Sequence, residues 1–266
     1  MEVHSLGCQT DLFFPQFDGE VIDRDFYKVI RTPSNPDFYW GNYILFRDAP
    51  VSGDREAWEH VFDVEIKSRL PVRHYAFCWD SAAGDTGRSQ EFTANGYSLL
   101  RGIVLAAEVV NPPPKANDEV EVRPLHAEWE WRQALQNQVD CRGDGFTLEE
   151  YLPFKREQMA RYHRMSDAGL GHWFGAFCEG KLVADLGIFV RDGMARFQSV
   201  GTNPAYRRLG ICGTLVYQAS QYAFANMNVG TLVMVADEDY FAAAIYESVG
   251  FRPRERQVNL EKRPGA

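Results

Sequence analysis

The chain lacks the features that mark several large classes of protein. Its 266 residues include five cysteines, which are widely spaced, odd in number and without a C-x-x-C pair. This argues against a disulfide framework and favours a reducing compartment. No apolar run is long enough to span a bilayer. The N-terminus has no basic region followed by an apolar stretch, so no signal peptide is predicted. We therefore expect a cytoplasmic protein without a membrane partner.

Signatures of metal sites and of several enzyme classes are also missing. The six histidines show neither H-x-x-x-H nor H-E-x-x-H spacing, so no metal site is expected. There is no G-x-S-x-G elbow and no P-loop lysine. A formal net charge of -9 argues against nucleic acid as a partner and mildly favours cationic ones. The simplest role of this charge is solubility.

The composition that remains suits a globular protein, with 45% hydrophobic and 14% aromatic residues. The clearest boundary is the segment 111–119, which contains Pro112, Pro113 and Pro114. Three consecutive prolines are incompatible with a helix interior or a central strand and favour a stiff, extended connector. The sequence therefore predicts two domains, covering residues 1–115 and 120–266.

The second half has a clear succession of expected elements. A strand at 120–123 precedes a helix at 126–139, and Thr147 with Glu150 forms a capping box for a helix from about 148 to 166. Turn signals at 179–180 and 192–193 separate three strands at 173–178, 182–190 and 195–202. A helix at 209–227, a buried strand at 231–235, a helix at 240–248 and a strand at 251–260 complete the order.

The first half shows a related rhythm. Strands are expected at 26–31, 39–46, 74–79 and 97–107, with a helix at 55–70 and a short helix before the last strand. The segment 92–97 matches 246–251 in register. Each has an aromatic residue, then three other residues, then glycine and a second aromatic residue. The match indicates an internal duplication, and the alternative is chance similarity between two αβ endings.

The segment 200–214 carries the strongest functional signal. A strand stops at Pro204, Arg207 and Arg208 follow, and small residues open a long amphipathic helix. The first turn of a helix offers free N–H groups and the positive end of the helix dipole, and small residues there let an anion approach the backbone. The pattern predicts a pyrophosphate-binding site. The alternative is that the glycines only allow tight packing of the helix on the sheet.

This segment resembles the coenzyme A signature of the GNAT superfamily of N-acetyltransferases, which is Gln or Arg, two residues, Gly, one residue, then Gly or Ala. Here these positions are Arg207, Gly210 and Cys212, and the cysteine departs from the pattern. The segment 239–251 resembles a second family motif, although Asp239 stands where the family usually has Asn. The resemblance covers about residues 120–262.

The resemblance implies an acyl-CoA N-acyltransferase fold of the α/β (α+β) class, with a mixed, mostly antiparallel sheet flanked by helices. The first half would be a smaller, degenerate αβ domain of related topology. The implied cosubstrate is acetyl-CoA, without a metal. The implied cofactor-binding residues are Val200, Gly201, Thr202, Arg207, Arg208, Leu209, Gly210, Ile211, Cys212, Gly213, Thr214 and Asp239.

The resemblance also implies the reaction. The strand ending at Thr202 would splay from the strand at 231–235, and the acceptor amine would attack the thioester directly. Tyr246 would donate a proton to the leaving thiolate, and the alternative for Tyr246 is a core aromatic residue. The general base stays open between Asp185, Glu247 and water.

The acceptor also stays open between a small-molecule amine and a protein amino group. A non-catalytic CoA-binding or regulatory module is the alternative function. We expect a monomer or a homodimer.

Overall fold

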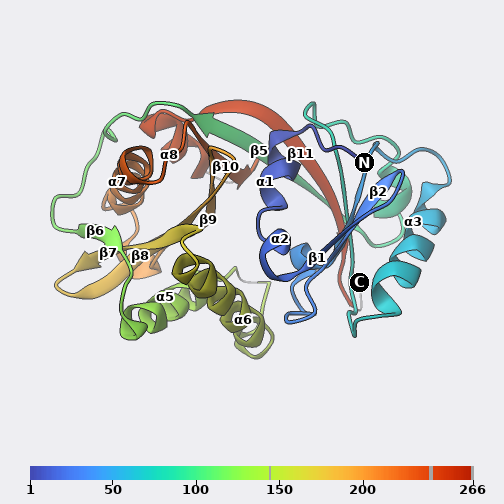
Figure 1. The fold of residues 1–266 in the computed structure, drawn as a ribbon, viewed down its shortest axis with the longest axis horizontal. Coiled ribbons are helices and arrows are strands. Elements are labelled where there is room, and N and C mark those ends of the chain that lie inside the picture. The colour runs from blue at the N-terminus through green and yellow to red at the C-terminus, as the bar shows by residue number, and fades with distance from the viewer. Residues whose placement is uncertain (144, 240–241, 265–266) are drawn as a thin grey trace. The chain divides into compact units, whose positions relative to one another are not determined.

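The computed structural model describes residues 1–143, 145–239 and 242–264. It divides into two compact units, which are not contiguous in sequence. The first unit comprises 1–104, 235–239 and 254–266, and the second comprises 105–234 and 240–253. Three strands, β5 (Ser98–Ala107), β10 (Thr231–Asp237) and β11 (Arg252–Lys262), have residues in both units. Figure 1 labels these elements.

The first unit has a mixed sheet with the order β1-β2-β3-β4-β11. Its helices are α1 (Leu6–Asp11), α2 (Pro15–Asp18), α3 (Asp54–Phe62) and α4 (Gln90–Thr93), and α3 continues as a π-helix at Asp63–Lys67. Its other strands are β1 (Glu20–Asp23), β2 (Tyr27–Arg31), β3 (Tyr43–Phe46) and β4 (Tyr75–Trp79). The pair β3–β4 is parallel, and the pairs β1–β2, β2–β3 and β4–β11 are antiparallel.

The second unit has a sheet with the order β10-β9-β8-β7-β6. Its strands β6 (Glu121–Pro124), β7 (Gly171–Cys178), β8 (Lys181–Arg191) and β9 (Met194–Thr202) are antiparallel neighbours, whereas β9 and β10 are parallel. The helices are α5 (Glu128–Asp140), α6 (Leu148–Asp167), α7 (Ile211–Asn226) and α8 (Ala242–Val249). The mixed, mostly antiparallel sheet flanked by helices is the predicted fold class.

Local sequence signals account for most elements of the second unit. The capping box at the start of α6 is present, because the Thr147 side chain accepts from the Glu150 N–H while the Glu150 side chain reaches the Thr147 N–H. Both predicted turns have two residues with positive φ, namely Glu179 with Gly180 and Asp192 with Gly193. Such turns match the twist of a two-residue hairpin, so β7, β8 and β9 form the predicted meander.

The first unit differs from the prediction at residues 39–46. Tyr39–Gly41 form a 3-10 turn and the strand starts only at Tyr43, although this stretch is rich in aromatic residues. The cause is the buried side chain of Asn42, which donates to the Asn35 and Phe38 carbonyls and accepts from the Thr32 N–H. These side-chain hydrogen bonds stabilise a loop in place of the ladder of a strand.

Helix α8 begins at Ala242, while the predicted start at Tyr240 lies outside the described residues. None of the helices in the described ranges has both the length and the apolar character needed to cross a bilayer.

Candidate active site

The second unit contains a gap between two strands of its sheet. Strands β9 and β10 pair from Met194–Thr231 to Arg196–Val233, and no described pair within this unit extends the ladder towards Thr202. The last residues of β9 continue to pair with β8 up to Ala184–Thr202. The edge of β9 that faces away from β8 therefore has no described strand partner from Phe197 onward, which leaves a strand edge to which an extended ligand can add. Three carbonyls of this stretch, those of Ser199, Gly201 and Thr202, accept hydrogen bonds from side chains.

A β-bulge lies in this open part of β9. The register moves from Gly187–Gln198 to Asp185–Gly201, so that Ser199 and Val200 together oppose Leu186. Ser199 has φ of 49°, which is uncommon for a residue with a side chain. A bulge of this kind re-aims the backbone, and here it lies on the wall of a cavity.

The cavity has a volume of about 890 Å³, which lies within the range of ligand-binding pockets. Its lining residues come from the segment 113–115, the residue that follows α5, the end of β9, the turn before α7, the N-terminus of α7 and helix α8. They are Pro113, Pro114, Lys115, Cys141, Val200, Gly201, Thr202, Pro204, Tyr206, Arg207, Arg208, Gly210, Ile211, Cys212, Gly213, Ala242, Ala244, Ile245, Tyr246 and Ser248.

The N-terminus of α7 gives the cavity an electropositive end. Gly210 caps the helix in the left-handed conformation with φ of 83°, and the first turn that follows has backbone N–H groups without helical acceptors. Arg207, Arg208 and Lys115 add three positive charges, and the two arginines are exposed. Helix dipole and side-chain charges therefore favour a negatively charged ligand at the same place.

Comparison with known families identifies this part of the chain. Residues 129–251 match the family model described as "Acetyltransferase (GNAT) family". This range includes the bulged strand, the electropositive helix end and Tyr246. Residues 129–251 form a GNAT acetyltransferase domain.

Solved structures show that the fold of the whole chain recurs. A conserved protein of unknown function from Staphylococcus epidermidis has a TM-score of 0.69 at 16% identity, covering 94% of this chain and 96% of that one. A GCN5-related N-acetyltransferase from Kribbella flavida gives 0.65 at 14% identity, covering 99% and 98%. A tandem GNAT protein from the clavulanic acid biosynthesis pathway gives 0.60 at 12% identity, covering 100% and 91%. A comparison with functionally curated proteins finds no match.

Most of the predicted site residues of the GNAT domain lie on the cavity. Tyr246 is buried in its wall, and nine of the predicted cofactor-binding residues line it, namely Val200, Gly201, Thr202, Arg207, Arg208, Gly210, Ile211, Cys212 and Gly213. The described lining does not include three others. Leu209 is exposed, and Thr214 is buried with its hydroxyl accepting from the Asn117 N–H. Asp239 belongs to the first unit, where it is exposed in the turn after β10.

The proline-rich segment 111–119, which precedes the GNAT domain, contributes more to the cavity than the sequence predicted. Lys115 Nζ donates to the Arg208 carbonyl at 2.7 Å, and Asn117 Nδ2 donates to the Leu209 carbonyl at 3.0 Å. Pro113 packs so closely on the start of α7 that a Cβ on Gly213 would lie 3.0 Å from it. These contacts join positions about a hundred residues apart, so no local pattern could have indicated them.

Behind β9, a buried carboxylate organises a polar network in the GNAT domain. Asp185 is fully buried, and its Oδ1 accepts from Asn137 Nδ2 at 2.9 Å and from Gln138 Nε2 at 2.7 Å. Its Oδ2 accepts from Trp173 Nε1 at 3.0 Å. Burial raises the pKa of Asp185 to about 7, while the three hydrogen bonds and the charge of Lys155 act in the opposite direction.

Lys155 is the charged neighbour of this network, and it too is buried. Its Nζ donates to Gln158 Oε1 at 2.6 Å and lies over the rings of Tyr151 and Phe154. Burial lowers the pKa of Lys155 to about 8. Close to the cavity, burial raises the pKa of the Cys141 and Cys212 thiols to about 11, so both thiols are neutral at physiological pH.

We expect the buried carboxylate to make stability depend on pH. The pKa of Asp185 is about 7 in the folded chain and about 3.9 when unfolded. Between these values the folded state binds the extra proton, so the contribution to stability present at low pH is lost as pH rises. Asp185→Asn has no such titration. From pH 4.5 to 6.5, its stability relative to the parent should therefore rise by roughly 1–3 kcal/mol.

Urea unfolding of both proteins at the two pH values measures this change. The comparison stays below the pKa of Lys155, so that the ammonium group is charged throughout. A stability difference that is the same at pH 4.5 and 6.5 would mean that Asp185 is ionised in the folded chain across this range.

The first unit repeats the local geometry of the GNAT domain. Gly53 caps α3 in the left-handed conformation with φ of 87° and ψ of -5°, as Gly210 caps α7 with φ of 83° and ψ of -4°. The Tyr97 N–H donates to the Phe92 carbonyl at 3.2 Å, as the Phe251 N–H does to that of Tyr246. The strand pairs also correspond, because β2–β3 and β8–β9 are antiparallel whereas β3–β4 and β9–β10 are parallel.

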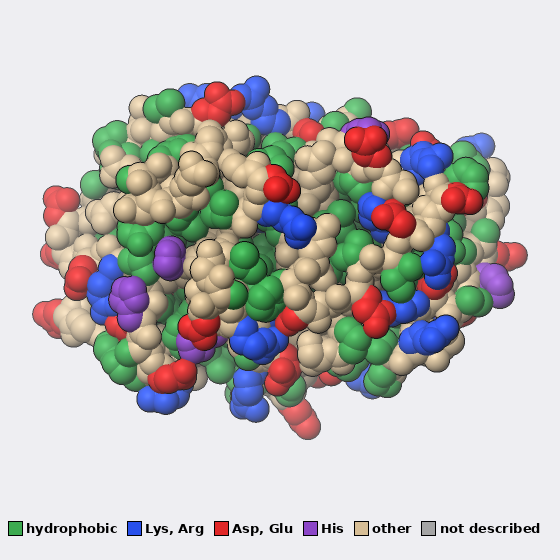
Figure 2. All heavy atoms as spheres, viewed as in Figure 1, with side chains coloured by type: hydrophobic (Ala, Val, Ile, Leu, Met, Phe, Trp, Pro, Cys, Tyr) green, Lys and Arg blue, Asp and Glu red, His purple; other side chains and the backbone are tan. Residues whose placement is uncertain are grey.

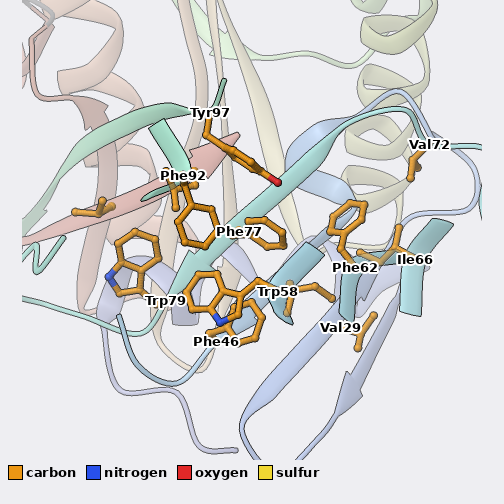
Figure 3. Packing of buried hydrophobic residues seen from close by; sticks show 13 residues of the cluster. Val29, Phe46, Trp58, Phe62, Ile66, Val72, Phe77, Trp79, Phe92 and Tyr97 are labelled. Carbon is orange, nitrogen blue, oxygen red and sulfur yellow. The ribbon is translucent and has the colours of Figure 1, made fainter. Parts of the chain in front are cut away.

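The first unit has no cavity at the place that corresponds to the site of the GNAT domain, as far as its described strand pairs and core residues show. Strands β3 and β4 pair up to their last residues, Phe46 and Trp79, so no gap opens between them. Phe92, which corresponds to Tyr246, is fully buried among Trp58, Phe77 and Tyr97, as Figure 3 shows. The residue of the first unit that corresponds to Tyr246 is thus part of a hydrophobic core.

In the first unit, the N-terminus of α3 corresponds to the N-terminus of α7, and there it binds a carboxylate of the chain itself. Glu91 accepts from the Gly53 N–H at 3.0 Å and from the Ser52 hydroxyl at 3.0 Å, at the N-terminus of α3. The Gly53 N–H lowers the pKa of Glu91, so the group is negatively charged. Asp54 accepts from the Val51 N–H at 2.7 Å in the same turn. The Gly53 N–H, the Ser52 hydroxyl and the Val51 N–H are therefore occupied by internal carboxylates.

Proposed function

We propose that the chain is an acetyl-CoA-dependent N-acetyltransferase that moves an acetyl group to an amine by direct attack. The observation that supports this most is the single cavity that joins an electropositive helix end, an open and bulged strand edge, and the phenol-bearing Tyr246. The helix end fits a nucleotide pyrophosphate, and the strand edge fits an arm that contains amide groups. The phenol of Tyr246 fits a leaving thiolate. The GNAT family match supports the same assignment.

Each part of the cavity has a defined task in this proposal. Backbone N–H groups at the start of α7, with Arg207, Arg208 and Lys115, hold the phosphates. The backbone of Val200 and Thr202 holds the pantetheine arm, in the way that an extended ligand adds to a strand edge. Bound acetyl-CoA supplies the acetyl group in activated form, as a thioester. Holding both reactants in one cavity removes much of the entropic cost of their meeting.

Proton transfers complete the reaction. The acceptor nitrogen forms a bond to the acetyl carbon, the carbon–sulfur bond breaks, and the phenol of Tyr246 protonates the sulfur. The acceptor nitrogen gives up one proton. Glu247 is exposed, Asp185 is enclosed by three N–H donors, and neither is among the described residues that line the cavity. This arrangement favours water as the proton acceptor.

The face of the molecule in Figure 2 has no large patch of one charge that would indicate a macromolecular acceptor. On the face shown in Figure 2, acidic and basic side chains are intermingled, so the net charge of -9 is not gathered there into one patch. This favours solubility as the role of the charge. A small-molecule amine is the acceptor class that we propose to test first.

Release of free thiol from acetyl-CoA, measured with a panel of cationic small amines, tests the proposed function. We expect acceptor-dependent release with at least one amine. Tight binding of acetyl-CoA without release for any amine or protein N-terminus would instead favour the non-catalytic CoA-binding module.

We expect the chain to bind one molecule of acetyl-CoA. The first unit has no strand gap, and Glu91 holds the donors at the N-terminus of α3. Asp48, Asp54 and Glu56 in the same region add further repulsion for a pyrophosphate. Isothermal titration calorimetry should therefore give a stoichiometry of one. A second site that persists after the Gly210→Asp substitution would place a cofactor in the first unit.

A further inference from the structure

The polar network around Asp185 holds the bulge of β9 through two backbone carbonyls. Gln138 Nε2 uses one hydrogen for Asp185 and donates another to the Ser199 carbonyl at 2.7 Å. Asn137 Nδ2 does the same with Asp185 and, at 3.4 Å, with the Gly201 carbonyl. The two carbonyls flank Val200, which lines the cavity. The bulge is therefore fixed at both of its ends by neighbouring residues of α5.

The hydrogen bond from Gln138 to the Ser199 carbonyl determines the direction of the Val200 N–H. The carbonyl of Ser199 and the N–H of Val200 belong to one peptide group, and no cis peptide bond occurs among the described residues. In a planar trans peptide the C=O and N–H point in opposite directions. With the carbonyl directed at Gln138, the Val200 N–H is directed away from α5.

Asp185 orients the two amides together with the Ser199 and Gly201 carbonyls, since each amide donates to the carboxylate and to one carbonyl. An ionised carboxylate only accepts hydrogen bonds, so both amides must turn their NH₂ groups towards it. This orientation leaves the Asn137 Oδ1 atom buried and without a partner in the described part of the chain. A flipped amide would instead place Oδ1 against two other acceptors, Asp185 Oδ1 and the Gly201 carbonyl. These two acceptors together fix the orientation of the Asn137 amide.

Space at Gly201 shows how closely the network approaches the strand. A Cβ on Gly201 would lie 3.1 Å from Gln138 Nε2 and 3.4 Å from both Asp185 Oδ1 and Cys141 Sγ. The side chains of the network therefore pack directly against the backbone of the cavity wall. A change in their orientation would be transmitted to the bulge without an intervening layer.

We propose that Asp185 is a positioning residue, which acts through Gln138 and Asn137 to aim the Val200 N–H at the thioester carbonyl of bound acetyl-CoA. This inference rests on the proposed function. A donor held on that oxygen polarises the carbonyl and stabilises the negative charge that develops there as the amine attacks. The phosphate-binding end of the cavity, at the start of α7, does not depend on this network.

The carbonyl stretching band of bound [1-¹³C]acetyl-CoA, measured by isotope-edited infrared spectroscopy, reports this contact without an acceptor. The measurement is made at pH 8.5, where Asp185 is ionised. In the parent protein the band should lie at lower frequency than in free acetyl-CoA. In Asp185→Asn and in Gln138→Leu it should move back towards the free position. The dissociation constant should change by less than about fivefold, since the phosphate contacts remain.

Gln133→Leu is the matched control, because Gln133 lies on the same helix and accepts from the Leu182 N–H at 2.8 Å, away from the bulge. It should keep the parent band. The double variant Asp185→Asn/Gln138→Leu should show no larger shift than either single variant, because both act through one contact. If Asp185→Asn does not fold, Gln138→Leu decides the question, since it keeps the carboxylate.

A parent-like band in the folded Gln138→Leu protein would overturn the proposal. So would a loss of affinity that accompanies the shift, because that would indicate general damage to the cavity. Absence of acetyl-CoA binding by the parent protein would overturn the proposed function itself, which separates the two failures.

Discussion

Replacing Tyr246 by Phe should lower turnover by a factor on the order of 10²–10⁴ while leaving the affinity for acetyl-CoA nearly unchanged. The ring is buried in the cavity wall, so Phe keeps its packing, and only the proton donor is lost. Without that donor, the sulfur leaves as a thiolate or must wait for a proton from water. Steady-state kinetics at saturating acceptor, with the dissociation constant measured in parallel, separates the two effects.

Tyr217→Phe is a suitable control, because Tyr217 lies on α7, outside the described lining of the cavity, and its hydroxyl accepts from Gln221 Nε2. It should retain the parent turnover. A Tyr246→Phe protein with parent turnover would show that the phenol only packs, as Phe92 does in the first unit. Equal losses in turnover and affinity would instead indicate a collapsed cavity.

Replacing Gly210 by Asp should weaken acetyl-CoA binding by a factor on the order of 10²–10³. Two effects combine. An added Cβ would lie 2.6 Å from the Lys115 carbonyl oxygen, at a residue with φ of 83°, so the backbone must shift. A carboxylate at the start of α7 would also repel the pyrophosphate, by several kcal/mol at 5 Å and an effective dielectric constant of about 20. Calorimetric titration measures the loss.

Two further variants divide this loss into its parts. Gly210→Asn has the same shape as Asp without the charge, so the ratio of the two affinities isolates electrostatic repulsion. Gly193→Asp places an Asp at another left-handed glycine, with φ of 76° and no neighbour within 4 Å, and should bind like the parent. Unchanged affinity in a folded Gly210→Asp protein would place the anion site elsewhere.

The parts of the site that could be predicted from the sequence are those formed by residues that are contiguous in the chain. The segment 200–214 combines a strand end, a proline, two arginines and a small-residue helix start, and all of these signals are local. The helices and strands of the second unit could be predicted for the same reason, since the capping box and both turns depend on residues that are close in sequence. The register match of Phe92 with Tyr246 also reflected a real correspondence, because both carbonyls accept the same hydrogen bond.

What could not be predicted depends on contacts between distant residues. Lys115 followed three prolines and had the pattern of a linker, yet it lies on the cavity wall and bonds to Arg208. Asp185 stood out as one carboxylate among several, while its amide partners are about fifty residues away on another helix. At Asn42, a single buried side chain replaced a strand by a loop against the local aromatic preference.

The pairing of β11 with β4 has a consequence for how the chain is made. Residues 259–262 complete the sheet of the first unit by pairing with residues 75–78. On the ribosome, β4 emerges nearly two hundred residues before its partner, so one edge of that strand stays open while the rest is synthesised. Open edges are where strands of other molecules add. The sheet of the first unit is therefore completed only when nearly the whole chain has been made, and truncation of the final strand would leave this edge of β4 exposed.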